Sequence, residues 1–153
     1  MKPSAETRSS IHQSVGYWAG MLSRTMEAEF SRRLAPSGIT RMSYAVLGAM
    51  VFDDKTTPSG IADFLRVDRA AVTRLLDKLE TQNLIARDKS TGDRRSISIR
   101  VTPEGNALAK ELRAHSQAVN AQFTKVLKPE DAGRFVELVK AMLATTDARP
   151  ESL

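Results

Sequence analysis

The spacing of apolar residues changes from helical to extended near residue 84 and changes back after residue 101. Elsewhere large apolar side chains recur every three or four residues, which predicts helices. Residues 84–87 and 96–101 instead predict two strands, the second with alternating apolar and polar side chains. The polar residues 88–95 between them include a glycine and predict a hairpin loop. The chain is therefore expected to be mainly α-helical, with one small β-hairpin.

Capping signals divide the helical part of the chain. Thr57-Pro58 and Thr102-Pro103 each combine a capping hydroxyl with a proline, which is tolerated at the first helical position. Thr40 and Asp68 are predicted to cap two further helices. The helix that follows Thr102-Pro103 is expected to end at Lys128-Pro129, before a last helix. These signals predict two short helices directly before the hairpin and a long helix directly after it.

The first part of the chain carries a long apolar stripe. Large apolar residues from Ile11 to Leu34 are spaced three or four apart, which predicts a single helix about 24 residues long. Pro36-Ser37-Gly38 is expected to stop this helix. This stripe and those of the last two helices can serve a core within the chain or an interface between two copies. We expect both uses, because helices this long exceed what a compact domain can cover.

The two short helices and the hairpin form a unit with a known use. Two short helices joined by a turn of three or four residues and followed at once by a basic hairpin are typical of a winged helix-turn-helix. The second helix fits the major groove of DNA, and the hairpin can reach the backbone or the minor groove. One such helix reads only a few base pairs, so a homodimer is expected. The predicted organisation is a single unit over 1–153, with a DNA-binding lobe over 40–101 and dimerisation helices over 11–36 and 103–147.

Positive charge is concentrated in this unit. The chain has a net charge of +5, and residues 66–100 hold nine Lys and Arg against five Asp and Glu. Residues near the start of a groove-inserted helix face base edges, which makes Arg69, Ala70, Thr73 and Arg74 the predicted readers. The alternative for these cations is an ordinary solvated face. The full predicted DNA-binding set is Arg66, Arg69, Ala70, Thr73, Arg74, Lys78, Lys89, Arg94 and Arg95, with Asp93 expected to orient a neighbouring arginine.

Four stretches of this region resemble the MarR family of bacterial transcriptional regulators. They are V-D-R-A-A-V-T-R-L-L-D-K-L-E at 67–80, N-L-I-A-R at 83–87, D-R-R-S-I-S-I at 93–99 and V-T-P-E-G at 101–105. The resemblance covers about residues 11–145. It implies a triangular dimer formed by the first and the last two helices, a palindromic operator, and release of DNA by a small, commonly aromatic, acidic ligand.

The chain departs from the family pattern at two positions. Arg66 stands in the turn between the two short helices, where the family usually has glycine, and a positive φ there would strain an arginine. Ala70 stands where a serine or threonine is common, which removes one contact to a base or phosphate. The contact pattern of the family is therefore not expected to transfer whole.

A ligand site between the dimerisation helices and the DNA-binding lobe is one of two interpretations of His115. His115 lies on the apolar stripe of the long helix, and His115 or Arg41 could meet an anionic group. The alternative, which we favour, is a hydrogen-bonded histidine in a core or interface. The candidate ligand-binding residues are Trp18, Arg41, Tyr44 and His115.

The composition bounds the other function classes. The chain has no cysteine, which excludes disulfides, thiolate zinc sites and thiol redox switches. It has only two histidines, so a metal site is not expected. No nucleophile elbow or phosphate-binding glycine loop indicates an enzyme, and no cofactor is expected. Without a signal peptide or a membrane-spanning apolar run, the protein is expected in the cytoplasm, with the nucleoid when bound to DNA.

The sequence thus favours a homodimeric regulator of transcription, most simply a repressor, that binds a palindromic operator in double-stranded DNA. A winged-helix module that binds proteins and has lost DNA binding is the alternative. The retained arginines at 69, 74, 94 and 95 argue against that alternative. Salt dependence discriminates the two, because neutralising phosphates makes binding fall steeply with salt.

Overall fold

The computed structural model describes residues 10–88 and 98–146. Short 3₁₀ turns flank the first helix, at Ile11–Gln13 and Ala35–Ser37. The described elements are the helices α1 (Val15–Leu34), α2 (Arg41–Phe52), α3 (Pro58–Leu65), α4 (Arg69–Thr81), α5 (Pro103–Thr124) and α6 (Pro129–Leu143), and the strands β1 (Ile85–Asp88) and β2 (Ser98–Val101). The expectation of a mainly helical chain with one small hairpin is confirmed.

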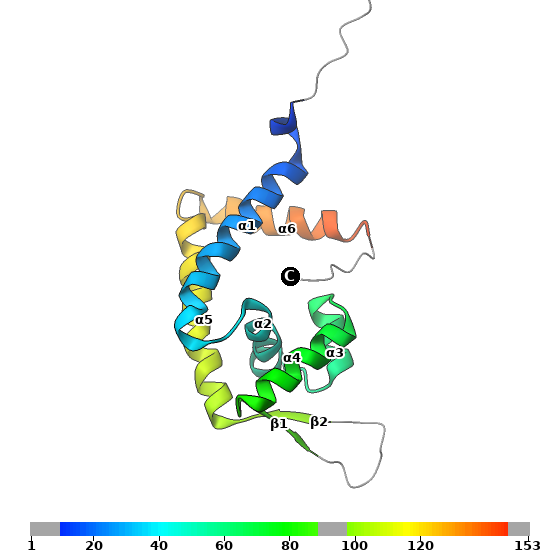
Figure 1. Ribbon diagram of the computed structural model, residues 1–153. Coiled ribbons are helices and arrows are strands. Elements are labelled where there is room, and N and C mark those ends of the chain that lie inside the picture. Colours follow the sequence, from blue (N-terminus) through cyan, green and yellow to red (C-terminus); the bar gives the residue numbers. More distant parts are fainter. Residues whose placement is uncertain (1–9, 89–97, 147–153) are drawn as a thin grey trace, which may run out of the picture.

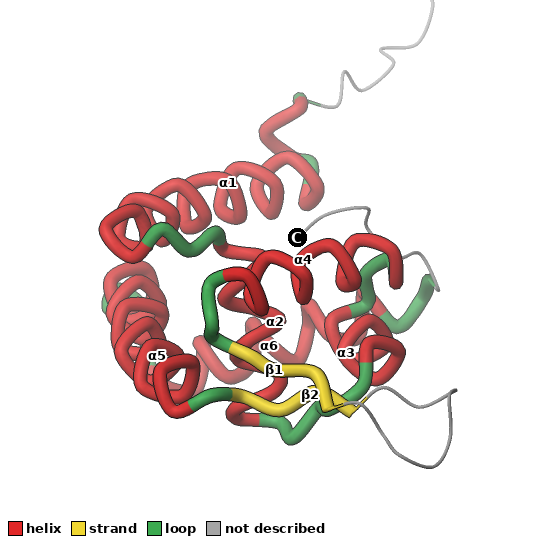
Figure 2. The backbone as a smooth tube through the Cα atoms, turned by 60° about the horizontal axis from the view of Figure 1, so that its bottom comes forward, coloured by secondary structure: helices red, strands yellow, loops and turns green. Residues whose placement is uncertain are grey.

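The helices and strands form two parts (Figure 1). We call residues 40–101, which hold α2, α3, α4 and the hairpin, the lobe. We call α1, α5 and α6 the stem. In Figure 1 the lobe lies at the bottom, α1 and α6 cross at the top, and α5 runs along one side from the hairpin to α6. Figure 2 shows the hairpin at the surface of the lobe, on the side opposite α1.

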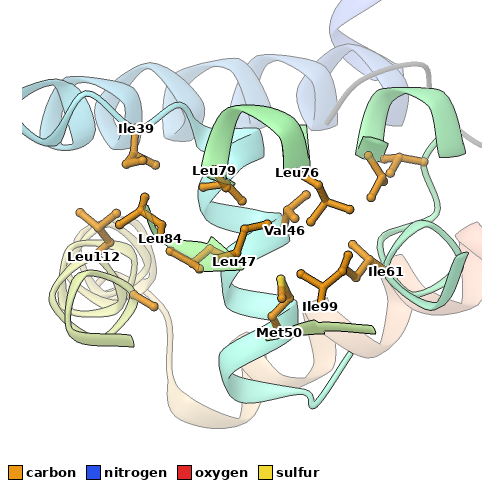
Figure 3. Packing of buried hydrophobic residues seen from close by; sticks show 14 of the residues in the cluster. Ile39, Val46, Leu47, Met50, Ile61, Leu76, Leu79, Leu84, Ile99 and Leu112 are labelled. Atoms are coloured by element: carbon orange, nitrogen blue, oxygen red, sulfur yellow. The ribbon is translucent and has the colours of Figure 1, made fainter. Parts of the chain in front are cut away.

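The core of the molecule lies in the lobe and reaches the adjoining faces of α1 and α5. Val46 and Leu47 of α2 are fully buried and face Leu76 and Leu79 of α4 (Figure 3). Ile99 of β2 closes this core from the side of the hairpin. Because α2 is covered on most of its circumference, it carries a nearly continuous apolar run rather than a narrow stripe.

Each predicted cap is present. The Thr40 hydroxyl accepts a hydrogen bond from the Ser43 amide at 3.1 Å, and the Thr57 hydroxyl accepts one from Gly60 at 3.1 Å. The Asp68 carboxylate accepts from the Ala71 amide at 3.0 Å. These bonds satisfy amide groups that the first turn of a helix leaves without partners. The predicted starts of α2, α3 and α4 are therefore confirmed.

The prediction of one continuous helix from Ile11 is wrong. The chain forms a 3₁₀ turn over Ile11–Gln13, and α1 starts only at Val15. The cause is Ser14, whose extended backbone and hydroxyl cap the new helix by accepting from the Tyr17 amide at 3.3 Å. Local side-chain hydrogen bonds of serine compete with helix continuation in this way.

The junction between the hairpin and α5 is tightly built. The Thr102 amide donates to the Leu84 carbonyl at 3.1 Å, and the Thr102 hydroxyl donates to the Asn83 carbonyl at 2.8 Å. A Cβ atom at Gly105 would lie only 2.0 Å from the Leu84 carbonyl oxygen. Glycine is therefore required in V-T-P-E-G because the first turn of α5 passes directly over the backbone before β1.

Candidate nucleic-acid interface

Helix α4 divides its residues cleanly between the core and the solvent. Val72, Leu76 and Leu79 are fully buried and hold the helix on the lobe. The opposite side is exposed, and nothing in the described chain covers it. We call this side the α4 outer face; its residues are Arg69, Ala70, Thr73, Arg74, Asp77, Lys78 and Thr81. The sequence-predicted readers thus share one exposed surface.

The cations of the α4 outer face are unequally paired. Arg69 lies 3.9 Å from Asp63 of α3, and both side chains are largely exposed, so this ion pair is weak. Arg74 and Lys78 form no ion pair with any residue in the described ranges 10–88 and 98–146. The Thr73 hydroxyl donates to the Arg69 carbonyl at 3.0 Å. Two positive charges on this face are therefore available to an anionic partner.

The turn between α3 and α4 contains the strained residue that the sequence suggested. Arg66 has φ 57° and ψ 39°, a left-handed conformation, and its side chain is exposed. The next residue, Val67, is fully buried, and its amide donates to the Ala62 carbonyl at 3.0 Å. The chain must turn this sharply to bury Val67 and still start α4 at Arg69. The strain expected at Arg66 is confirmed.

Arg87 contacts the recognition helix, although the sequence indicated only that it is one of the basic residues in 66–100. Its guanidinium forms ion pairs with Asp77 and Glu80 of α4, the second at 2.8 Å. The charges in residues 66–100 are therefore arranged rather than spread evenly, because one hairpin arginine pairs with two helix carboxylates and offsets one of their two negative charges. A pair of acids three residues apart on the preceding helix was the only sequence signal for this contact.

The tip of the hairpin lies outside the described residues. Lys89, Asp93, Arg94 and Arg95 belong to the stretch 89–97 and stay predictions. The two strands on either side are antiparallel, with Arg87 opposite Ile99 and Ala86 opposite Arg100. The Ile99 amide also donates to the Thr56 carbonyl at 3.1 Å, which ties the base of the hairpin to the segment before α3.

A cavity of about 300 Å³ lies where α1, α2 and α5 meet. Arg41 of α2 enters it and is paired with Glu27 of α1, Nη1 to Oε1 at 3.1 Å. The cavity thus contains one cation that is already partly neutralised. Its lining residues are Met26, Glu27, Phe30, Arg41, Ser116, Val119 and Asn120.

Two other candidate ligand residues lie near this cavity. Tyr44 is half-buried, packs edge-on against Phe30 with ring centroids 5.2 Å apart, and hydrogen-bonds with Ser116. Burial raises the pKa of the Tyr44 hydroxyl above its usual value, partly offset by the bond to Ser116 and by the charge of Arg113. His115 is half-buried on α5 beside Ser116 but does not line the cavity.

Trp18 is not brought to this cavity. It lies in a different groove, of about 850 Å³, between the first half of α1 and α6. Its indole Nε1 donates to the His12 carbonyl at 2.7 Å. Within one copy of the chain, Arg41 thus lines the cavity and Tyr44 contacts two of its lining residues, Phe30 and Ser116. Trp18 is separated from both.

The groove between α1 and α6 is lined almost entirely by apolar groups. Helix α6 has no buried residue, although most of its large side chains are apolar. The large hydrophobic residues exposed along it are Phe135, Val136, Leu138, Val139, Met142 and Leu143. None of the helices in the described part of the chain is long and apolar enough to cross a membrane. Across the same residues no group of three or more acidic or histidine side chains could hold a metal ion.

Comparison with known proteins identifies the family to which this fold belongs. Residues 37–96 match the model of the MarR family. The HTH-type transcriptional repressor MdtR of Bacillus subtilis (strain 168) is 32% identical over 110 residues, which cover 72% of this chain and 71% of the relative. The chain belongs to the MarR family. The resemblance inferred from the four sequence stretches is confirmed.

Solved structures of MarR-family regulators share the fold. A variant of MarR from E. coli, complexed with operator DNA, is 25% identical, with a TM-score of 0.75 over 84% of this chain and 92% of that one. CouR from Rhodococcus jostii RHA1, bound to p-coumaroyl-CoA, is 18% identical, with a TM-score of 0.76 over 88% and 94%. The expected winged helix-turn-helix fold and the role of a transcriptional regulator are confirmed. The relatives are regulators rather than enzymes.

Proposed function

We propose that this MarR-family protein is a homodimeric repressor that binds a palindromic operator in the cytoplasm and releases it when a small acidic ligand binds. The single observation that carries DNA binding is the α4 outer face, where Arg69, Arg74 and Lys78 stand exposed on a helix whose other side is buried. The complex of the E. coli MarR variant with operator DNA supports the same use of this fold.

Base reading is assigned to the first two turns of α4. Residues there face base edges when a recognition helix enters the major groove. Arginine can pair bidentately with guanine, so Arg69 and Arg74 are proposed as readers, and the Thr73 methyl can contact a thymine methyl. Ala70 is proposed to allow close approach without adding a polar contact. Arg66 and Lys78, with Lys89, Arg94 and Arg95 of the hairpin, are proposed to contact phosphates or the minor groove.

Dimerisation is assigned to the stem, residues 11–36 and 103–147. The support is α6, whose apolar residues, Phe135, Leu138 and Met142 among them, are about half exposed in a single copy. Covering the exposed half of such a side chain contributes roughly 1 kcal/mol. In a twofold dimer each contact occurs twice, which doubles that gain. The partner proposed for this face is a second copy of the chain, which also supplies the second recognition helix that a palindrome needs.

The ligand site is assigned to the cavity that Arg41 lines, with Tyr44 packed against Phe30 of its wall. Its size suits an aromatic carboxylate, and the carboxylate would replace Glu27 as the partner of Arg41. CouR, a regulator of the same fold, was solved with p-coumaroyl-CoA. Because the cavity joins α5 and α1 of the stem to α2 of the lobe, a ligand there can change the separation of the two recognition helices from the roughly 34 Å of one DNA turn. Trp18 and His115 are proposed to contribute only from outside this cavity.

The test is DNA affinity with matched charge removals. Fluorescence anisotropy would follow binding of the wild type, Arg74→Ala and Lys125→Ala to the DNA upstream of the gene and to random duplex. Lys125 is exposed at the stem end of α5, so its removal subtracts the same charge away from the α4 outer face. We expect Arg74→Ala to lose about 10- to 100-fold on the specific site and less on random DNA. Lys125→Ala should bind as the wild type does.

Two results would contradict the proposal. Equal behaviour of Arg74→Ala and Lys125→Ala on both DNAs would remove α4 from the interface. Undetectable or salt-independent binding by the wild type would instead favour a module that binds proteins.

A further inference from the structure

Arg87 joins the hairpin to the recognition helix, and we propose that it is a positioning residue for DNA binding. Its single positive charge offsets one of the two negative charges of Asp77 and Glu80 on α4, and its ion pairs fix the hairpin against that helix, so that both can approach DNA together. This inference rests on the proposed DNA-binding function and names a residue that the predicted contact set does not include.

The strand register aims Arg87 at α4. In the antiparallel pair Arg87 is opposite Ile99, and Ile85 lies two residues before it on the same strand. Side chains of opposite residues, and of residues two apart, share one face of a hairpin. Ile85 and Ile99 are both buried, so this face is the one that packs on the lobe. Arg87 therefore lies on the same inward-facing side of β1 as Ile85, and its side chain reaches α4.

The guanidinium meets two carboxylates at once. Nη1 donates to Glu80 Oε2 at 2.8 Å, and Nη2 donates to Asp77 Oδ1. The two acids stand three residues apart on α4, and the planar fork of arginine suits two acceptors at such a spacing. The Arg87 side chain is only 28% exposed, which makes these bonds less screened by solvent than ordinary surface pairs.

The position of Asp77 gives this contact its consequence for DNA. Asp77 belongs to the α4 outer face, one turn after Thr73 and beside Lys78. A carboxylate on a surface that meets phosphates opposes binding, as a like-charge contact does at any interface. Glu80 adds a second negative charge at the edge of that face. Arg87 offsets one of these two charges and does not itself belong to the α4 outer face.

The same contact sets the direction of the hairpin. A two-stranded hairpin is at best marginally stable by itself, so its orientation depends on what it packs against. Here the supports are the burial of Ile85 and Ile99, the bond from the Ile99 amide to the Thr56 carbonyl, and the ion pairs of Arg87. Arg87 is the support among these that links the hairpin directly to charged groups of α4.

The experiment uses the full chain in four forms beside the wild type. Arg87→Met keeps the length of the side chain and removes the charge, and Arg87→Lys keeps the charge without the fork. A triple variant combines Arg87→Met with Asp77→Asn and Glu80→Gln. The matched control is Arg33→Met, because Arg33 is 26% exposed and pairs with Glu29 at 2.7 Å. Arg33 contacts Gln122 of the same chain at the lobe end of α1, whereas the apolar α6 face proposed for dimerisation lies beside the other end of α1. Affinity for specific and random duplex is measured at several salt concentrations, with the midpoint of thermal unfolding for each variant.

We expect Arg87→Met to weaken binding to both DNAs by about tenfold or more, because two carboxylates of α4 lose their compensation. The triple variant should recover most of that loss, and Arg87→Lys should lie between. Arg33→Met should bind as the wild type does. Recovery in the triple variant separates the role from mere stability, since the three substitutions together restore no ion pair.

Two outcomes decide against the inference, and a third decides against the function on which it rests. Wild-type affinity for Arg87→Met, measured well below its unfolding midpoint, would overturn it while leaving DNA binding intact. So would a triple variant that binds as weakly as Arg87→Met, since the carboxylates would then have no part in the loss. Absence of binding by the wild type would instead defeat the proposed function itself.

Discussion

The lobe and the stem treat apolar residues in opposite ways. In the lobe, large side chains such as Leu47 and Leu76 are completely buried within one chain. In the stem, α6 presents a face of similar residues to solvent, and Met142 near the end of that helix is 54% exposed. A folded chain rarely leaves a contiguous face of this kind uncovered unless another molecule covers it. The lobe therefore buries its large apolar side chains within one chain, whereas the apolar face of α6 stays exposed there, as the proposed dimer interface would require.

Removing apolar volume from the lobe is the strongest way to break this comparison. Leu76→Ala would leave a cavity between α4 and α2, because Leu76 has no exposed surface. We expect a loss of about 2–5 kcal/mol in the free energy of unfolding. Urea unfolding followed by circular dichroism measures it. A loss below about 1 kcal/mol would mean that the lobe core is loosely packed.

A charge on the stem should act on assembly rather than on folding. Leu138→Asp places a carboxylate in the exposed apolar face of α6, where Leu138 is 50% exposed. We expect the dissociation constant of the dimer to rise about a hundredfold, close to 2.7 kcal/mol, because the carboxylate would be buried without a partner. Analytical ultracentrifugation measures this constant.

The control for the stem prediction is the neighbouring residue Glu137→Asp. That exposed residue already carries a charge, so the dimer should persist. A Leu138→Asp protein that stays dimeric at micromolar concentration would show that α6 is covered in another way, and the contrast between lobe and stem would lose its meaning.

The smallest effect sharpens the comparison inside the lobe itself. Arg66 adopts a left-handed conformation, which costs a non-glycine residue roughly 1 kcal/mol. We therefore expect Arg66→Gly to raise the stability of the lobe by about 0.5–1 kcal/mol and to lower DNA affinity, because a cation at the proposed interface is lost. Thermal unfolding and anisotropy measure the two effects.

Arg66→Asn separates strain from charge. Asparagine tolerates this conformation better than arginine does and carries no charge. It should bind DNA as weakly as Arg66→Gly does. A decrease in stability on Arg66→Gly would contradict the strain assigned to this turn.

The sequence predicted what depends on neighbours along the chain. Thr40, Thr57 and Asp68 cap their helices as predicted because a cap involves only the next three residues. The error at Ile11 is also local in origin, since the apolar spacing continues through Ser14 and gives no sign of which way its hydroxyl bonds. A stripe of apolar residues cannot by itself distinguish a core within the chain from an interface between copies.

Contacts between distant elements were beyond prediction. Arg87 pairs with residues seven and ten positions earlier, which requires the register of the hairpin and its angle to α4. Trp18 lies on the same helix as Met26 and Phe30, which line the cavity of Arg41, yet Trp18 faces α6 instead. Its direction depends on how α1 is rotated against α5, and that rotation is a property of the packed molecule.

Helix α4 keeps the residues that build the protein apart from those assigned to read DNA. Val72, Leu76 and Leu79 hold it in place, while positions 69, 70, 73 and 74 contribute nothing to the core. Over generations, a duplicated gene can therefore change these four side chains one at a time and acquire a new operator, with every intermediate still folded. Changes at the exposed recognition positions therefore cost little stability, whereas changes at the buried positions of α4 would destabilise the fold.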